Sequence, residues 1–333
     1  MTAGGDPARG ELRVAALGGG HGLFATLQAL RRLTRDITAI VTVADDGGSS
    51  GRLRHELGII PPGDLRMALA ALMLDDPDGL FWAEVLQHRF GGGGAMAGHP
   101  IGNLVLAGLC EVLGDPVAAL DAFVQRFGVQ GRVLPMVPGP LRIEADVAGL
   151  EEDPRLTRVI RGQVAVASTP GKVRRVRLMP PDPDACPEAI RAILDADVVT
   201  VGPGSWFSSV IPHVLVPAQL EALEATRARR ILILNLAPEA GETGGFSAER
   251  HLHVLAAHAE RLQFDDIIVD VDTVPSDGDR EHLMRATALF GARAHFVPVS
   301  VPGTHQHDVV ALAEAIRDVK YSEQIAARQR TDR

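Results

Sequence analysis

The sequence is poor in several residue types, and these shortages exclude some classes of protein. Aromatic residues make up 4 % of the 333 residues, so a core must be built from alanine, valine, leucine and isoleucine. Only Lys172 and Lys320 are lysines among the 33 basic residues, and the single tyrosine is Tyr321. A nicotinamide-dependent oxidoreductase with a catalytic Tyr–Lys pair is therefore excluded, and only a histidine-based hydride enzyme remains open in that class.

Cysteine, long apolar runs and positive charge are also scarce. Cys110 and Cys186 lack the spacing of metal ligands and predict a reduced cytosolic protein rather than a disulfide scaffold. The first residues show no apolar stretch typical of a secretory signal, and no apolar run is long enough for a membrane span. A formal net charge of -9 argues against a general surface for nucleic acid or anionic lipid. We therefore expect a cytoplasmic protein with no nucleic-acid partner and no membrane span.

The apolar residues fall into short runs that alternate with helical patterns. Residues 12–17 predict a buried strand and residues 23–33 an amphipathic helix. Between them stand Gly18, Gly19, Gly20, His21 and Gly22. Strand, glycine turn and helix form the first unit of a dinucleotide-type fold, in which the helix N-terminus faces a phosphate. The alternative is a glycine turn that only packs the helix on the strand.

A second predicted strand, residues 37–43, is followed by a polar, glycine-rich stretch. The residues that follow are Asp45, Asp46, Gly47, Gly48, Ser49, Ser50, Gly51 and Arg52. Glycines let the backbone approach a ligand and offer its N–H groups to anionic oxygens. An exposed turn is the alternative, but the stretch contains more polar residues than a turn needs. We interpret it as a loop that forms the floor of a binding site.

Two later strands end in the same way. The strand predicted at 197–201 is followed by Gly202, Gly204 and Ser205, and the strand at 230–236 is followed by a second polar loop. That loop contributes Asn235, Glu242 and Thr243. Because parallel strands place their carboxyl ends at one edge of a sheet, we expect one crevice there, lined by all four strand-end loops.

Four further polar residues stand at predicted helix starts. Asp64 either caps the helix that runs to residue 74 or faces a ligand. Arg66 follows in the first turn, where a cation is disfavoured by the helix dipole, which indicates a ligand. His99 precedes a proline, and a single histidine in that position is more often structural than catalytic. Asn103 has a low helix propensity at a helix start, which suggests close approach of the backbone to a ligand or neighbouring segment.

The strand–helix alternation predicts a doubly wound, mostly parallel Rossmann-like α/β sheet with a small antiparallel β-rich insert at about 132–180. We expect residues 1–11 to be a mobile leader, 12–318 a single nucleotide-binding domain and 319–333 a tail. His251 and His258 share a helix face that His253 does not, so no metal site is predicted.

Several strings together identify a resemblance that covers residues 12–318. GGGHGL, AIVTVADDGGSSGRLR, PPGDLR, HPIGNL, VGPGSWFSSVIP, NLAPEAGETGGFSAERH and the HD pair at His307 resemble the YvcK family of bacterial gluconeogenesis factors. The wider superfamily includes the CofD enzymes, 2-phospho-L-lactate transferases, which share the fold. The first loop of the family usually reads GGGTG, so His21 would replace a hydroxyl contact to phosphate with an imidazole.

The resemblance implies a cytoplasmic regulator that binds a UDP-sugar, with UDP-N-acetylglucosamine as the expected ligand, and links carbon metabolism to peptidoglycan precursor supply and cell shape. No catalytic residue, no metal ligand and no required cofactor are implied, although Mg²⁺ can accompany the nucleotide. The implied partners are a regulated enzyme of amino-sugar or cell-wall synthesis and further copies of the chain, as a homo-oligomer. The alternatives are a CofD-like or other nucleotide-dependent transferase, and an NAD(P)-binding oxidoreductase.

Overall fold

The computed structural model describes residues 11–153, 155–239 and 242–331. The expected leader therefore lies outside the described residues apart from Glu11. The carboxylate of Glu11 accepts a hydrogen bond of 2.6 Å from the backbone N–H of Arg35. This contact ties the first described residue to the loop that precedes the second strand.

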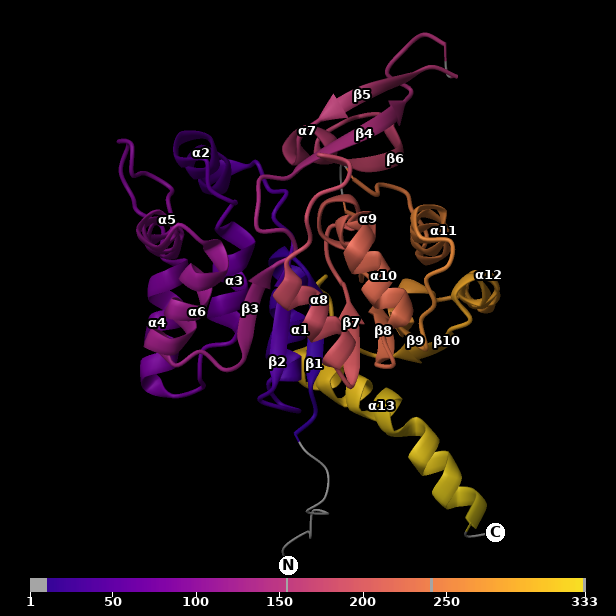
Figure 1. The fold of residues 1–333 in the computed structure, drawn as a ribbon. Coiled ribbons are helices and arrows are strands. Elements are labelled where there is room, and N and C mark those ends of the chain that lie inside the picture. Colours follow the sequence, from indigo (N-terminus) through magenta and orange to yellow (C-terminus); the bar gives the residue numbers. More distant parts are fainter. Residues whose placement is uncertain (1–10, 154, 240–241, 332–333) are drawn as a thin grey trace, which may run out of the picture.

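Seven strands form the main sheet, in the order β10-β9-β8-β7-β1-β2-β3 (Figure 1). Their bounds are β1 Val14–Gly18, β2 Ile37–Val41, β3 Arg132–Pro135, β7 Val198–Val201, β8 Arg229–Ile233, β9 Asp266–Asp270 and β10 Arg293–Val297. Every pairing between these strands is parallel, which confirms the predicted fold class. The chain adds strands on one side of β1 and then returns to add the others from β7 outward. The strand order thus reverses between β1 and β7, where open α/β sheets place their ligands.

Helices cover both faces of this sheet. Their bounds are α1 Gly20–Leu30, α2 Gly48–Leu57, α3 Gly63–Ala71, α4 Pro77–Gln87, α5 Ile101–Leu113, α6 Pro116–Phe127, α8 Pro187–Asp195, α9 Pro212–Leu215, α10 Pro217–Ala225, α11 Ala248–His258, α12 Asp277–Thr287 and α13 Val309–Thr331. Helix α1 packs against α3 and α13, and α8 packs against α10 in front of the sheet (Figure 1). Because parallel crossovers are right-handed, growth of the sheet in two directions from β1 places helices on opposite faces.

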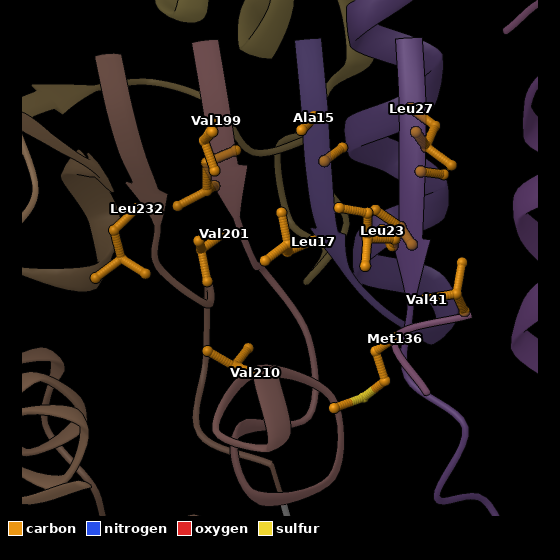
Figure 2. Close-up of a cluster of buried hydrophobic side chains, with 14 of the residues drawn as sticks. Ala15, Leu17, Leu23, Leu27, Val41, Met136, Val199, Val201, Val210 and Leu232 are labelled. Carbon is orange, nitrogen blue, oxygen red and sulfur yellow. The ribbon is translucent and has the colours of Figure 1, made fainter. Parts of the chain in front are cut away.

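Small aliphatic side chains build the core, as the shortage of aromatic residues requires. Leu17 on β1 is fully buried and lies beside Val201 on β7, while Leu23 packs from α1 (Figure 2). Burying one such side chain contributes about 2 kcal/mol, so a core of many leucines and valines can hold strand ends that carry glycine loops.

The antiparallel insert is smaller than expected. Its three strands are β4 Arg142–Ala148, β5 Thr157–Arg161 and β6 Lys172–Met179, with the short helix α7 Gln163–Ala167 between the last two. The expectation that it begins at 132 is wrong, because β3 pairs with β2 in the main sheet and Val133 and Leu134 are fully buried there. Figure 1 shows the insert above the carboxyl edge of the main sheet.

The C-terminal boundary also differs from the expectation of a tail after residue 318. The structure continues α13 without interruption to Thr331. Residues 319–331 contain neither glycine nor proline, so nothing in the sequence ends the helix earlier.

Candidate functional site

A crevice opens where the strand order reverses, beyond the carboxyl ends of β1 and β7. It has two parts, which we call the polar cavity, of about 390 Å³, and the outer cavity, of about 760 Å³. Both parts are lined by His21, Gly22, Gly204 and Glu239. The polar cavity adds Gly19, Gly20, Thr42, Asp45, Asp64, Gln163, Ser205, Ser208 and Ser209. The outer cavity adds Phe24, Ala25, Gln28, Pro203, Asn235, Leu236, Ala237, Pro238, Thr304, His305, Gln306, His307 and Val309. Each of the four predicted strand-end loops contributes to this one crevice.

The glycines of the first loop bring two backbone segments into contact. A Cβ on Gly22 would lie 2.2 Å from the carbonyl oxygen of Pro203, and a Cβ on Gly19 would lie 2.5 Å from Cγ2 of Thr42. At Gly20, φ is +56° and no atom lies within 4 Å of the Cβ position, so its backbone borders open space. The loop therefore does both things that the sequence left open: it packs α1 on the sheet and leaves the start of α1 facing the cavity. The packing of α1 on the sheet requires glycine, because a side chain would clash there.

A buried histidine fixes the end of β1. Nε2 of His213 lies 3.2 Å from the carbonyl oxygen of Gly18, and Nδ1 lies 2.7 Å from the side-chain nitrogen of Gln219. Because the amide nitrogen of Gln219 can only donate, Nδ1 accepts and Nε2–H donates to Gly18. Burial lowers the pKa of His213 to about 4, so the ring is neutral near pH 7. Sequence reasoning missed this residue, because a single histidine in an apolar segment carries no signal.

The third and fourth loops hold each other. The side chain of Asn235 accepts a hydrogen bond of 3.0 Å from the N–H of Gly204 and donates one of 2.8 Å to its carbonyl oxygen. The hydroxyl of Ser205 donates to Glu242 at 2.5 Å and also pairs with Ser208. Burial raises the pKa of Glu242, and the hydroxyls and backbone N–H groups around it oppose that rise. Asn235, Gly204 and Ser205 line the crevice, whereas Glu242 supports it from behind.

Three carboxyl groups line the polar cavity: Asp45, Asp64 and Glu239. Burial, together with the charge of Asp45, raises the pKa of Asp64 to about 7, while the N–H of Gly20 and Arg66 oppose the rise. Burial and the charge of Glu242 raise the pKa of Glu239 to about 7. Burial also raises the pKa of Asp45. Near neutral pH the cavity can therefore gain or lose protons, a property typical of functional sites.

Of the two alternatives for Asp64, the cap on its own helix is wrong. Helix α3 has no side-chain hydrogen bond at its N-cap, Pro62. The carboxylate of Asp64 instead interacts with the backbone N–H of Gly20, at the start of α1. The alternative that Asp64 faces a ligand cavity agrees with its place in the lining.

Sequence reasoning missed several residues that line the crevice, among them Glu239 and Gln163. Glu239 lines both cavities, and Thr243 holds it by donating its N–H to the carbonyl oxygen of Glu239 at 3.0 Å and accepting the N–H of Glu239 at 2.9 Å. Gln163 reaches the polar cavity from the insert, 117 residues beyond Asp46, which binds its backbone. Only a contact across the fold brings Gln163 there, so no local pattern could find it.

The polar stretch after β2 is mostly a helix rather than a loop. Helix α2 begins at Gly48, where φ is +48°, and includes Ser49, Ser50 and Arg52. Of the whole stretch only Asp45 lines the crevice. The hydroxyl of Ser50 donates to the Asp45 carboxylate and so positions it.

Asp46 and Gly47 join the insert to the main domain. The two carboxylate oxygens of Asp46 accept hydrogen bonds from the N–H groups of Gln163, at 3.0 Å, and Val164, at 2.9 Å. A Cβ on Gly47 would lie 2.9 Å from Cγ2 of Val164. These residues hold the start of α7 over the crevice and do not line it themselves. Gly18 and Gly202, also predicted as ligand-binding, lie beneath the lining in the same way.

Four predicted ligand-binding residues form a buried polar chain outside the crevice. Nε of Arg66 donates to Asn103 at 3.0 Å, and Nδ2 of Asn103 donates to the hydroxyl of Ser49 at 3.0 Å. That hydroxyl lies 2.8 Å from Nδ1 of His99. The chain joins α2, α3 and α5. Arg52 is exposed beside it and donates to the carbonyl oxygen of Ala97 at 2.9 Å. None of the five lines either cavity.

The described residues contain no group of three or more His, Cys, Asp or Glu side chains arranged for a metal ion. They also include no helix with the length and apolar character needed to cross a membrane. The fold and the crevice together define a parallel α/β protein whose ligand site lies at the reversal point of the sheet. The profile of the family described as 2-phospho-L-lactate transferase CofD matches residues 14–296. The chain belongs to this CofD-like family and, within it, to the YvcK family of gluconeogenesis factors.

Known proteins match this chain in sequence and structure along most of its length. A Mycobacterium leprae protein named "Putative gluconeogenesis factor" is 65 % identical over 93 % of this chain and 87 % of its own length. The Bacillus subtilis protein named "Gluconeogenesis factor" is 38 % identical over 82 % of this chain and 83 % of its own length. A crystal structure of a UPF0052 family member from Bacillus halodurans has a TM-score of 0.81 and 35 % identity, over 93 % of this chain and 100 % of that one.

Proposed function

We propose that the protein is a cytoplasmic regulator that binds a nucleotide sugar, UDP-N-acetylglucosamine, and links central carbon metabolism to peptidoglycan precursor supply and cell shape. The observation that carries the proposal is the two-part crevice at the reversal point of the sheet. Its parts have volumes typical of small-molecule sites and meet at four shared residues, so one elongated ligand can occupy both. The names of the relatives support the link to carbon metabolism.

The pyrophosphate of such a ligand would bind where the two cavities meet. Glycine loops from β1 and β7 bring their backbone within contact distance there, because Gly22 and Pro203 touch. Backbone N–H groups at the start of α1 favour negative charge. The hydroxyl-rich polar cavity would suit one end of the ligand, and the outer cavity, with Phe24 and Leu236 in its wall, would suit the other.

Mg²⁺ would accompany the ligand rather than reside in the protein. The carboxylate oxygens of Asp45, Asp64 and Glu239 are donors that Mg²⁺ prefers, and all three face the polar cavity. Mg²⁺ usually combines one or two carboxylates with phosphate oxygens. In the absence of an ion, burial keeps the pKa of each of these carboxyl groups raised, so an ion that arrives with a phosphate would favour their charged forms.

A regulator needs a protein target, and an enzyme of amino-sugar or cell-wall synthesis remains the predicted partner. Assembly into a homo-oligomer also stays a prediction. Light scattering of the purified chain with and without UDP-N-acetylglucosamine checks the second point, because an oligomer gives a multiple of the 35.4 kDa chain mass. A monomer at all concentrations would remove it.

A titration with a matched pair of histidine variants tests the ligand. His21 is exposed and lines both cavities, whereas His55 is exposed on α2 and lines neither. Isothermal titration of the wild-type chain with UDP-N-acetylglucosamine should give saturable binding. His21→Ala should weaken it about tenfold, the loss of one hydrogen bond to a charged group, and His55→Ala should leave it unchanged. The absence of heat at millimolar ligand would remove the proposal.

A second candidate is a transferase of the CofD kind, favoured by the family match and by three carboxyl groups in one cavity. Phosphoryl-group chemistry depends on metal-bound phosphates positioned by carboxylates, and this cavity offers the carboxylates. Incubation with a GTP-derived lactyl donor and a deazaflavin acceptor tests it. A coupled product that Asp45→Asn abolishes would favour the transferase, and no product would favour the regulator.

A further inference from the structure

Arg66 on α3 is a largely buried arginine that forms no ion pair among the described residues. Only 4 % of the surface of Arg66 is exposed to solvent. Its Nε donates to Asn103 at 3.0 Å, and within the described part of the chain this is the side chain's only hydrogen bond or ion pair. Both Nη groups are therefore free to donate. Neither Nη atom is among the buried polar atoms that lack a partner, so both reach the surface, where they can donate to an anion.

The charge of Arg89 acts on Arg66, and those of Arg52 and Arg89 act on His99. Burial and the charge of Arg89 lower the pKa of Arg66 to about 10. Burial, Arg52 and Arg89 lower the pKa of His99. Arg89 donates to the carbonyl oxygen of Gly98 at 2.8 Å, so the guanidinium groups of Arg52 and Arg89 both hold the exposed glycine-rich segment 91–98. We call Arg52, Arg66, Arg89 and His99 the basic cluster.

Few negative charges balance the basic cluster. Asp64 raises the pKa of Arg66, and Glu56 raises that of His99. Neither carboxylate forms an ion pair with Arg52, Arg66 or Arg89 in the described ranges. The cluster therefore holds three guanidinium groups in an environment with excess positive charge, inside a chain whose formal net charge is -9.

The basic cluster is separate from the crevice. Successive residues of an α-helix are about 100° apart, so Asp64 and Arg66 point to nearly opposite sides of α3. Asp64 faces the polar cavity, whereas the stem of Arg66 packs against α5: a Cβ on Gly102 would lie 2.8 Å from its Cγ. Figure 1 places α2, α3 and α5 together on one side of the sheet.

We propose that the basic cluster is a second anion site, which binds a phosphate group of a small ligand on the far side of α3 from the crevice. A guanidinium presents paired N–H donors that match two phosphate oxygens, and charge-assisted bonds of this kind are about twice as strong as neutral ones. The excess positive charge of three arginines suits a doubly charged phosphate better than a singly charged carboxylate. The proposal does not depend on what the crevice binds.

Inorganic phosphate is the probe that tests this site. We would titrate the full-length chain with phosphate and follow the arginine Nε–Hε signals by NMR, assigning each from its own substitution. Saturable shifts are expected for the signals of Arg52, Arg66 and Arg89. Arg89→Gln, at an exposed position, should weaken phosphate binding about tenfold. The matched control Arg227→Gln, also exposed and remote from the basic cluster, should not change it.

A variant of the crevice distinguishes phosphate binding at the basic cluster from phosphate binding in the crevice. Ser205→Ala alters the lining of the polar cavity and should leave phosphate binding at the basic cluster unchanged. Loss of phosphate binding in Ser205→Ala together with full binding in Arg89→Gln would place phosphate in the crevice and overturn the proposal. An Arg66 Nε–Hε signal that does not shift at tens of millimolar phosphate would overturn the proposal too.

Discussion

The two sides of helix α3 present opposite chemistry. On one side the crevice is lined by carboxyl groups, hydroxyls and backbone of the glycine loops, and His21 is its shared basic side chain. On the other side the basic cluster gathers three arginines that form no ion pair with a carboxylate in the described part of the chain. The crevice would thus hold an anion through oriented backbone N–H groups and a metal ion, and the basic cluster through side-chain charge. Substitutions on the two sides should therefore affect different ligands.

The largest expected effect is on the glycine contact that shapes the crevice. In Gly22→Ala the new Cβ would lie 2.2 Å from a backbone oxygen and 2.5 Å from a backbone carbon of Pro203, neither of which can turn aside. We expect a loss of about 3 kcal/mol of unfolding free energy, from overpacking, with loss of nucleotide binding. Urea unfolding measures the first and calorimetry the second. Gly93→Ala, where nothing lies within 4 Å, is the control, and equal stability of the two variants would show that the contact is absent.

A smaller effect concerns the protonation of the crevice. The pKa of Asp64 is raised in the folded chain from 3.8 to about 7, so the folded state binds this proton more tightly than the unfolded state. The unfolding free energy of the wild type should therefore fall, relative to Asp64→Asn, as pH rises from 4 to 7, and the difference should be constant above that. Denaturant titrations across this pH range give the result. The same comparison with the exposed Asp182→Asn should show no such trend. A wild-type unfolding free energy that rises with pH relative to Asp64→Asn would contradict the assignment.

The smallest expected effect is at the edge of the basic cluster. Arg52 is exposed, and its hydrogen bonds within the described residues go to backbone oxygens of the segment 91–98. Arg52→Gln should change the affinity for UDP-N-acetylglucosamine, and the stability, by no more than about 0.5 kcal/mol. Calorimetry and urea unfolding check both. A tenfold loss of nucleotide-sugar affinity would mean that Arg52 reaches the crevice and that the two sides of α3 are one site.

Much of the fold could be predicted from the sequence, because buried parallel strands have a clear apolar pattern and end in glycine loops. The sequence could not predict which side of its strand end or helix each polar residue would face. Asp45 and Asp46 are neighbours, yet one lines the crevice and the other holds the insert. Asp64 and Arg66 also face different sides, because helix geometry points residues two apart in nearly opposite directions. Gln163 lines the polar cavity, and His213 holds the end of β1, only through contacts across the fold, which no local pattern encodes.

The central claim is that the crevice, and not the basic cluster, binds the nucleotide sugar. Hydrogen–deuterium exchange of the intact chain with and without saturating UDP-N-acetylglucosamine tests it most directly, because bound backbone N–H groups exchange more slowly. We predict protection of residues 19–28, 203–209 and 235–239, with no change in residues 89–103. Protection of residues 89–103 with unchanged exchange at the glycine loops would contradict the account.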